Sequence, residues 1–416
     1  MSYLSGRTQI VQVESRTSSE LECDDSGVPQ GSVLGGLLHV IMSNDFPACH
    51  DEGEAVVYVD DDSDFVSDKD PNVLIEKIQA EASNSSQWLK DNRLCVAGEK
   101  SKLLVLGTRE MRLAKLDMND MEIVVDGKLV TESSSEKLLG LVMNNNLTWK
   151  NHLYGDGENT GLIPQLARRL GMLKRLAKFM SKEKLAYFSS GIFYSKLSYC
   201  LPVFGNIFGL DTYKEENRRY FSYTVKDNDK LQVLQNKLNK LLTNADHNTP
   251  TAELLDQTGS LSVHQMIAYQ TVVATHKVVK SGKPAYIAAK MTVRQNNLDT
   301  RQGAGAVLPP AYNKLNLARE GFIYRGAKIY NKLDATLRTE TKLEKFKSGA
   351  RDWVKKNISI KPKPYFSSIT VGTRRNQPPP SPPPAEPPPP PLRNTIRRYF
   401  LPLQQYPPNH HNNQTM

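Results

Sequence analysis

AVVYVDDDSDFV occupies residues 55–66 of this 416-residue chain and is its most informative segment. A β-branched run ends in consecutive aspartates and Phe65-Val66 restores the apolar pattern, so the stretch predicts a β-hairpin with an acidic tip. Adjacent carboxylates repel each other unless a cation or a proton offsets the charge, and carboxylate oxygens are ligands that Mg²⁺ prefers. Because aspartate is also common in turns, the stretch alone leaves a metal site and a solvated acidic turn as alternatives.

The residues around this hairpin predict a small antiparallel sheet with helices. The apolar run Leu37–Met42 follows a glycine-rich turn and indicates a helix, and Asp70-Pro71 is typical of a helix start. Asp126-Gly127 lies between two apolar runs and predicts a tight hairpin turn. Residues 1–155 are therefore expected to form an α+β fold. Its other predicted strands are residues 9–13, 103–106, 123–125, 129–130 and 138–143.

Beyond residue 160 the apolar spacing becomes helical. A stripe of leucines predicts a helix at residues 162–177. The segment 378–391 is proline at every position except Ser381, Ala385 and Glu386, which favours polyproline structure, and we expect the tail to be disordered. Thr249-Pro250 is expected to start a short helix, and further helices are predicted at residues 182–200, 228–243, 261–280, 320–333 and 340–356.

The charge is divided unevenly along the chain. Residues 1–155 hold 14 Lys and Arg against 26 Asp and Glu, whereas residues 156–416 hold 40 against 18. Acidic clusters suit metal ions and basic surfaces suit phosphates, although either can be a merely solvated face.

Composition excludes several classes of protein. Four cysteines without a CxxC pair argue against a disulfide scaffold and a zinc ribbon. No apolar run approaches the roughly 20 residues of a membrane helix, and no basic-then-apolar leader opens the chain. We expect an intracellular protein, nuclear or cytoplasmic, that is not secreted and has no membrane partner.

Four segments that follow the same order as a known set of motifs add to the evidence from the hairpin. GVPQGSVLG at residues 27–35 precedes YVDD at 58–61, GEKSK at 98–102 and LLGLVM at 138–143. This set resembles the reverse transcriptases of non-LTR retrotransposons, in particular the jockey-like group. GVPQGSVLG is similar to their motif B, YVDD to motif C, GEKSK to motif D and LLGLVM to the motif E region.

The resemblance implies a role for each matching residue. Asp60 and Asp61 would be catalytic and would bind two Mg²⁺ (or Mn²⁺) ions, and Lys100 would protonate the leaving pyrophosphate. A glycine at position 31 also suits a binding site on physical grounds, because the backbone can approach a ligand closely only where no side chain intervenes. The implied substrate-binding residues are Tyr58 and Val59 near the primer end, and Pro29, Gln30 and Gly31 around the template base and the incoming nucleotide.

The implied reaction is nucleotidyl transfer, in which a DNA primer on an RNA template attacks the α-phosphate of a dNTP. The implied architecture is a partial right-hand polymerase palm at 1–155, a helical thumb-like region at 156–356, and a disordered Pro-rich tail at 357–416.

The chain also departs from this pattern. The metal site of the family needs a further aspartate from motif A, which lies well before motif B, and the short segment before Gly27 contains no apolar–Phe-Asp pattern. The fingers are missing as well. We therefore expect a truncated or inactive fragment, the C-terminal half of a polymerase, whose sheet lacks a central strand and keeps a poorly covered edge.

The basic second part supports nucleic-acid binding, since Lys and Arg on a helix can track a phosphate backbone. An ordinary amphipathic helix is the alternative. A nucleic-acid-binding protein without catalysis therefore stays open as a function, as does an interaction protein whose proline run at 378–391 docks into an SH3 or WW groove, or is only a spacer. The candidate nucleic-acid-binding residues are Arg168, Arg169, Lys174, Arg175 and Lys178.

Overall fold

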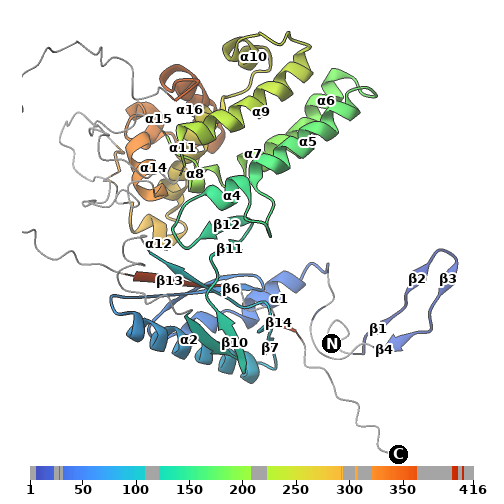
Figure 1. Cartoon of the computed structure of the whole chain (residues 1–416), viewed down its shortest axis with the longest axis vertical. Helices are drawn as coiled ribbons and strands as arrows, with labels where there is room; N and C mark the ends of the chain where they lie inside the picture. The colour runs from blue at the N-terminus through green and yellow to red at the C-terminus, as the bar shows by residue number, and fades with distance from the viewer. Residues whose placement is uncertain are drawn as a thin grey trace, which may run out of the picture. The chain divides into compact units, whose positions relative to one another are not determined.

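The computed structural model divides the chain into two compact units, residues 1–136 with 390–416, and residues 137–389 (Figure 1). Each unit is described by itself. The part of the chain that the structure describes comprises residues 6–22, 28, 31–107, 121–207, 223–291, 293, 305–307, 321–362, 396–401 and 405–406.

The first unit opens with short exposed strands and one apolar helix. Strand β1 (Thr8–Gln9) pairs with β4 (Leu21–Glu22), and β2 (Gln12–Val13) pairs with β3 (Arg16–Thr17), all antiparallel. Helix α1 (Gly35–Met42) follows the glycine-rich turn as predicted, and none of its residues is buried. The 3₁₀ helix η1 (Phe46–Cys49) then leads toward the hairpin.

The acidic hairpin forms as the sequence predicts. Strand β5 (Glu54–Tyr58) pairs antiparallel with β6 (Asp61–Asp68), and Tyr58 stands opposite Asp61. The turn between them consists of Val59 and Asp60, and Val59 has a φ of 61°. A β-branched residue rarely adopts positive φ, so this tip is a strained turn.

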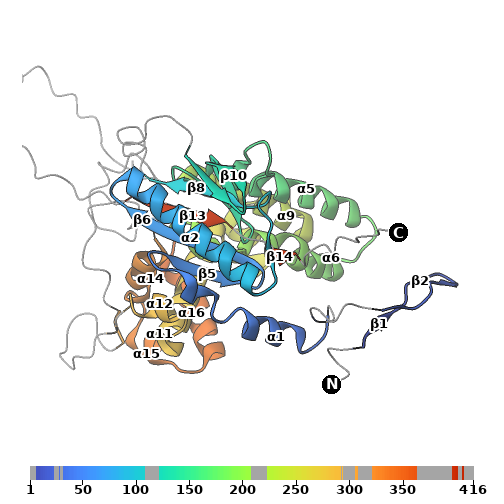
Figure 2. The ribbon, with the colours of Figure 1, turned by 90° about the horizontal axis from the view of Figure 1, so that it is seen from below.

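Helix α2 (Pro71–Asp91) follows, with its start fixed by Asp70. The Asp70 side chain accepts a hydrogen bond from the backbone N–H of Asn72 at 2.9 Å, and Pro71 occupies the first turn. The helix lies across the sheet, where Leu74 and Ile78 pack with Val66 and other strand residues in the core of this unit (Figure 2).

The main sheet has the strand order β5-β6-β13-β8. Strand β13 (Ile396–Leu401) runs antiparallel to β6 and to β8 (Lys102–Leu106), and it stands between them. Strand β14 (Gln405–Tyr406) pairs with β7 (Cys95–Val96). A missing central strand and a disordered tail are expected from the sequence, whereas the structure fills the central position with residues of that tail.

Two further hairpins differ in how well the sequence predicts them. Strands β9 (Glu122–Val125) and β10 (Lys128–Thr131) meet at the predicted Asp126-Gly127 turn. The single strand expected at 138–143 is wrong: β11 (Ser135–Leu138) and β12 (Leu141–Asn144) form a hairpin there. Leu139 and Gly140 both have positive φ, and such a backbone turns the chain back on itself.

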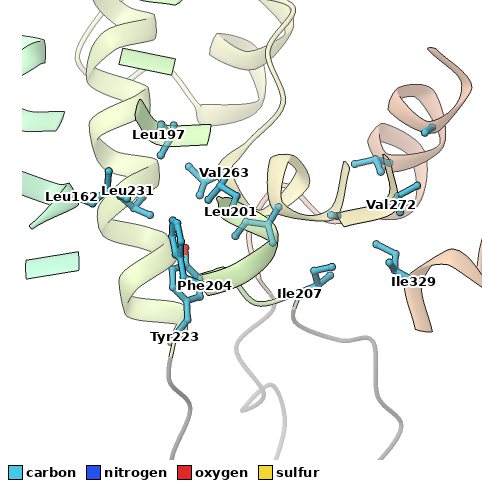
Figure 3. Close-up of a cluster of buried hydrophobic side chains, with 14 of the residues drawn as sticks. Leu162, Leu197, Leu201, Phe204, Ile207, Tyr223, Leu231, Val263, Val272 and Ile329 are labelled. Atoms are coloured by element: carbon cyan, nitrogen blue, oxygen red, sulfur yellow. The ribbon is translucent and has the colours of Figure 1, made fainter. Parts of the chain in front are cut away.

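The second unit also contains strand β12, but it is mainly helical and has one large core. In this core, Leu201 and Phe204 from one helix converge with Tyr223, which lies just before another helix, and with Val263 (Figure 3). The predicted stripe at 162–177 is confirmed, because Leu162, Leu166, Leu170 and Leu173 of α5 are all buried. The helices of this unit are α4 (Lys150–Tyr154), α5 (Leu162–Leu176), α6 (Lys182–Ser189), η2 (Ser190–Tyr194), α7 (Ser195–Ser198), α8 (Leu201–Phe204), α9 (Val225–Thr243), α10 (Thr251–Gln257), α11 (Val263–Ser281), α12 (Ala285–Ala288), α14 (Phe322–Tyr330), α15 (Ala335–Thr339) and α16 (Leu343–Asn357).

The fold class is therefore α+β, mostly helical, with small antiparallel sheets. Within the described ranges, no helix combines the length and apolar character that crossing a bilayer requires.

Candidate functional site

The tip of the β5–β6 hairpin carries the two predicted catalytic carboxylates. Asp60 is exposed in the turn, and Asp61 is half-buried at the start of β6. Burial, together with the negative charge of Asp60, raises the pKa of Asp61 above its ordinary value. A cation bound beside both groups would remove this repulsion, so the tip favours binding of positive charge.

Helix α1 is joined to this tip by one side chain. His39 Nε2 lies 2.8 Å from the carbonyl oxygen of Val59, and because that oxygen can only accept, the ring nitrogen donates. The bond fixes the strained residue whose φ is 61°. Helix α1 and the acidic turn, which are separated in sequence, are thereby held together.

A buried second layer of polar groups lies behind the tip, and the sequence did not predict it. Asp64 is 1% exposed and accepts a hydrogen bond from Ser85 Oγ at 3.2 Å, and its other carboxylate oxygen lies 2.9 Å from His50 Nε2, within ion-pair distance of the protonated ring. Burial lowers the pKa of His50, but the hydrogen bond and the charge of Asp64 outweigh it and raise the pKa overall. The only signal for this layer is the alternation of Asp62 and Asp64 along the strand.

Asp62 in the same layer is 2% exposed. Burial, assisted by the charges of Asp64 and Asp61, raises its pKa to about 7. Near neutral pH this carboxyl is therefore partly protonated.

Two further groups of this layer have structural roles. Glu81 accepts the backbone N–H groups of Glu52 at 2.6 Å and Gly53 at 2.8 Å, and it anchors the segment that leads into β5. Cys49 Sγ lies 3.5 Å from His50 Nδ1. Burial raises the pKa of the Cys49 thiol to about 11, so this group stays protonated and is a poor nucleophile.

Lys100 is placed by the sheet register. It is exposed in the turn before β8, and its backbone N–H donates to Ala97 O at 2.8 Å. Strands β6 and β8 are both antiparallel to β13, so they run in the same direction. The start of β8, which Lys100 precedes, therefore lies at the same end of the sheet as Asp61, with one strand between.

The predicted substrate-binding residues differ in how far the structure describes them. Tyr58 and Val59 are 61% and 59% exposed at the tip. Gly31 has a φ of 81°, which an L side chain rarely adopts, and no atom of the described residues beyond its chain neighbours lies within 4 Å of where its Cβ would be. Pro29 and Gln30 lie outside the described residues.

The donor chemistry at the tip suits a hard cation, but the described residues do not complete a metal site. Asp60 and Asp61 supply the carboxylate oxygens that Mg²⁺ prefers. Among the described residues, no group of three or more His, Cys, Asp or Glu side chains is arranged to hold a metal ion.

Comparison with known proteins finds polymerases of transposable elements from Drosophila melanogaster. The RNA-directed DNA polymerase from mobile element jockey is 26% identical over 159 residues, which is 36% of this chain and 16% of the relative. The probable RNA-directed DNA polymerase from transposon X-element is 24% identical over 191 residues, which is 45% of this chain and 20% of the relative. The chain is a distant, partial relative of retrotransposon reverse transcriptases.

This finding confirms the resemblance drawn from the four motifs. The chain matches only a fifth or less of the length of these retrotransposon polymerases. No protein-family model and no solved structure matches it.

The candidate nucleic-acid-binding residues lie on and just after α5. Arg168, Lys174, Arg175 and Lys178 are exposed, whereas Arg169 is half-buried and donates to the backbone carbonyl of Ile192. Arg169 thus links α5 to the backbone of η2.

The spacing of residues in α5 places basic and apolar side chains on the same face of this helix. Arg168, Met172 and Arg175 follow the intervals of four and three positions that align side chains along a helix, and Phe179 lies in the turn after the helix. Phe179 is 85% exposed. A basic face with exposed aromatic side chains is typical of surfaces that contact nucleic acid.

Proposed function

We propose that this chain is a portion of a non-LTR reverse transcriptase, an RNA-directed DNA polymerase that extends a DNA primer on an RNA template with dNTPs. The tip of the β5–β6 hairpin carries the proposal: two adjacent carboxylates on a strained turn, bonded to the helix of the glycine-rich segment. The distant similarity to polymerases of the jockey mobile element and the X-element supports the same assignment.

In this proposal Asp60 and Asp61 hold Mg²⁺ or Mn²⁺. The bound metal would stabilise the attacking and leaving oxygens of the phosphoryl transfer. Asp60 is exposed and can reach a ligand directly, and Asp61 is half-buried beside it. The pocket around the nucleotide would be formed by Pro29, Gln30 and Gly31, with Tyr58 and Val59 near the primer end.

Lys100 would protonate the leaving pyrophosphate. A lysine carries its proton at neutral pH, and negative charge develops on the leaving oxygen during transfer. The parallel direction of β6 and β8 supports this role, because it brings the turn of Lys100 and the acidic tip to one end of the sheet.

We further propose that residues 1–155 act as a partial palm and 156–356 as a thumb-like region that contacts the template–primer duplex. The described residues offer two carboxylates at the tip and no complete metal site. We therefore propose that the chain by itself binds template–primer but does not extend it.

Metal binding at the tip is tested with the full chain and Mn²⁺. Paramagnetic broadening of the Val59 methyl resonances is expected, and Asp60→Asn should abolish it. Glu54→Gln is the matched control, because Glu54 is an exposed carboxylate at the far end of β5, roughly 13 Å along the strand. Equal broadening in Asp60→Asn and the parent would overturn the assignment.

Primer extension on an RNA template with Mg²⁺ tests the second half of the proposal. The chain alone is expected to give no product. Extension that disappears in Asp60→Asn and persists in Glu54→Gln would support the assignment to reverse transcriptases and contradict the proposed lack of activity.

A nucleic-acid-binding function without catalysis is the second candidate, and the exposed face of α5 favours it. Binding of an RNA–DNA duplex that is unaffected by Asp60→Asn and by Mn²⁺ would favour this candidate. The proline run at 378–391 lies outside the described residues. Pull-down by SH3 and WW domains, with this run deleted as the control, tests a docking role for it.

A further inference from the structure

The main sheet has one strand position, between β6 and β8, that is not filled by the segment connecting these two strands. Strand β6 is connected to strand β8 through helix α2 and the short strand β7, and β6 and β8 run in the same direction. Adjacent strands lie about 4.8 Å apart, so the two strands are separated by roughly 9.6 Å and one strand fits between them. The crossover through α2 thus leaves a gap with two inward-facing edges.

The described occupant of this gap comes from close to the C-terminus, far away in the sequence. In β13, Tyr399 is the partner of both Phe65 in β6 and Leu104 in β8. Its register runs from Ile396 opposite Asp68 to Leu401 opposite Lys102. Both neighbours therefore supply backbone hydrogen-bonding groups to the same short segment, and a strand without this occupant would present unpaired groups on each side.

Charge and a second contact favour the same occupant. Residues 390–416 contain three arginines and no acidic residue, whereas residues 51–70 contain nine acidic residues and one lysine. Opposite charges of this kind attract the tail to the sheet. The tail is also attached at a second place, where Tyr406 pairs with Cys95.

We propose that the gap between β6 and β8 is a docking site for one extended peptide strand, and that residues 396–401 are its intramolecular, exchangeable occupant. The link from α16, which ends at Asn357, to β13, which begins at Ile396, is long and rich in proline. The occupant is therefore joined to the rest of the chain by a long connection and not by a tight turn within the sheet. The same segment supplied as a separate peptide then binds by strand addition. This proposal does not depend on the proposed function.

Hydrogen exchange of the full chain tests the site. A proline at the centre of β13 removes a backbone donor and is not tolerated between two paired strands, so Tyr399→Pro should vacate the gap. Amides of residues 65–68 and 102–106 should then exchange faster by on the order of tenfold. Ala385→Pro is the control, because it adds a proline to a run that is already proline-rich, and it should leave this exchange unchanged.

Addition of a peptide with the sequence of residues 394–406 should restore the protection in Tyr399→Pro and have no effect on the parent, whose gap is filled. If Tyr399→Pro exchanges like the parent, the gap does not hold β13 and the proposal is wrong. Failure of the peptide to restore protection would equally overturn the exchangeable site.

Cross-linking provides a test that does not require the strand to be removed. Ser67 and Arg397 are direct partners in the register. Antiparallel partners have Cα separations that a disulfide can span, so Ser67→Cys with Arg397→Cys should form a bridge within one chain. Ser67→Cys with Thr415→Cys is the control. A bridge that forms only between two chains, or no faster than in the control, would contradict the intramolecular occupant.

Discussion

At the scale of single residues, the acidic hairpin contains carboxyl groups in contrasting environments. Asp60 is exposed in the turn, while Asp62 is 2% exposed only two positions later. Burial is what raises the pKa of Asp62 to about 7, with the neighbouring Asp64 and Asp61 contributing. The group is therefore a local sensor of pH next to the candidate metal site.

The folded state should be less stable at neutral than at acidic pH because of Asp62. The folded pKa is about 7 and the unfolded value is 3.8, so between these values the folded chain retains a proton that the unfolded chain releases. The stabilisation is complete below pH 3.8 and is lost as the pH rises toward 7. At about 1.4 kcal/mol per pKa unit, the loss is at most about 4 kcal/mol.

Denaturant unfolding of the parent and Asp62→Asn between pH 4 and pH 8 measures this effect. The difference in free energy of unfolding between the two proteins should change across this interval, in favour of the variant as the pH rises. Two curves that stay parallel would show that Asp62 does not titrate in this way.

Arg325 is a second residue whose role comes only from the tertiary structure. It is 4% exposed, and its guanidinium donates to the carbonyls of Pro202 at 2.9 Å and Val203 at 3.1 Å, and to that of Gly205. These carbonyls belong to the end of α8, where a helix leaves acceptors without intrahelical partners. The arginine therefore caps one helix from another.

Arg325→Met should lower the free energy of unfolding by roughly 2–4 kcal/mol, because buried carbonyls lose their donors. Arg325→Lys should lose less, since it keeps one donor group. Lys328→Met, a half-exposed base on the same helix, is the control and should change stability little. Equal losses in Arg325→Met and Lys328→Met would mean that the carbonyl contacts do not matter.

At the scale of elements, one side chain of α2 protects a strand edge. Gln79 Nε2 donates to Val124 O at 2.8 Å, and Val124 N donates to Gln79 Oε1 at 2.7 Å. In the described part of the chain β9 pairs with β10 alone, so this amide takes the place of a neighbouring strand. The Gln79 amide pairs with the backbone N–H and C=O of Val124, which would otherwise be exposed at a strand edge and could pair with another chain.

Gln79→Ala should reduce the free energy of unfolding by about 1–2 kcal/mol, since two hydrogen bonds are lost. The exchange of the Val124 amide should also accelerate. Glu76→Ala, an exposed position one turn earlier on the same helix, controls for the change in helix propensity. Unaltered exchange at Val124 in the first variant would refute the role of the amide.

Elements defined by local chemistry are those that the sequence predicts well. The Asp70 cap and the Asp126-Gly127 turn depend on near neighbours, and both form as expected. The hairpin at 135–144 was missed because Leu139, a bulky residue with a φ of 45°, gives no turn signal of its own. The sequence does not predict strand β13, because its pairing partners lie in the first third of the chain and the residues around 396–401 carry no pattern that points to them.

The candidate site divides in the same way. The acidic tip follows from consecutive aspartates, and the helix after the glycine-rich turn follows from the apolar run at 37–42. The bonds of His39 to Val59 and of His50 to Asp64 join segments that belong to different elements, and no local pattern announces them. The sequence therefore predicts the carboxylates at the tip, and only the tertiary structure shows which side chains pack around them.

At the scale of the whole molecule, charge is segregated along the chain. Residues 1–155 carry a net charge of −12 and residues 156–416 a net charge of +22. Binding of a nucleic acid through the second part releases counterions from its phosphates, so affinity should fall steeply with salt and depend little on sequence.

The slope of log affinity against log salt counts the phosphate contacts, at about 0.7–0.9 per contact. Full-length chain with an RNA–DNA duplex, measured by fluorescence anisotropy, should give a steep slope. Arg168→Gln with Arg175→Gln should flatten it by about 1.5, because the two exposed side chains lie on one face of α5. Phe179→Ala should weaken binding without changing the slope, since stacking releases no counterions.

Lys355→Gln with Lys356→Gln is the matched control for this experiment. Both lysines are exposed in α16 of the same unit, and the double substitution removes the same charge. If the α5 face binds the duplex, this control leaves the slope near that of the parent. If both double variants reduce the salt slope equally, binding responds to total charge and not to a defined surface. That result would contradict the proposed role of α5.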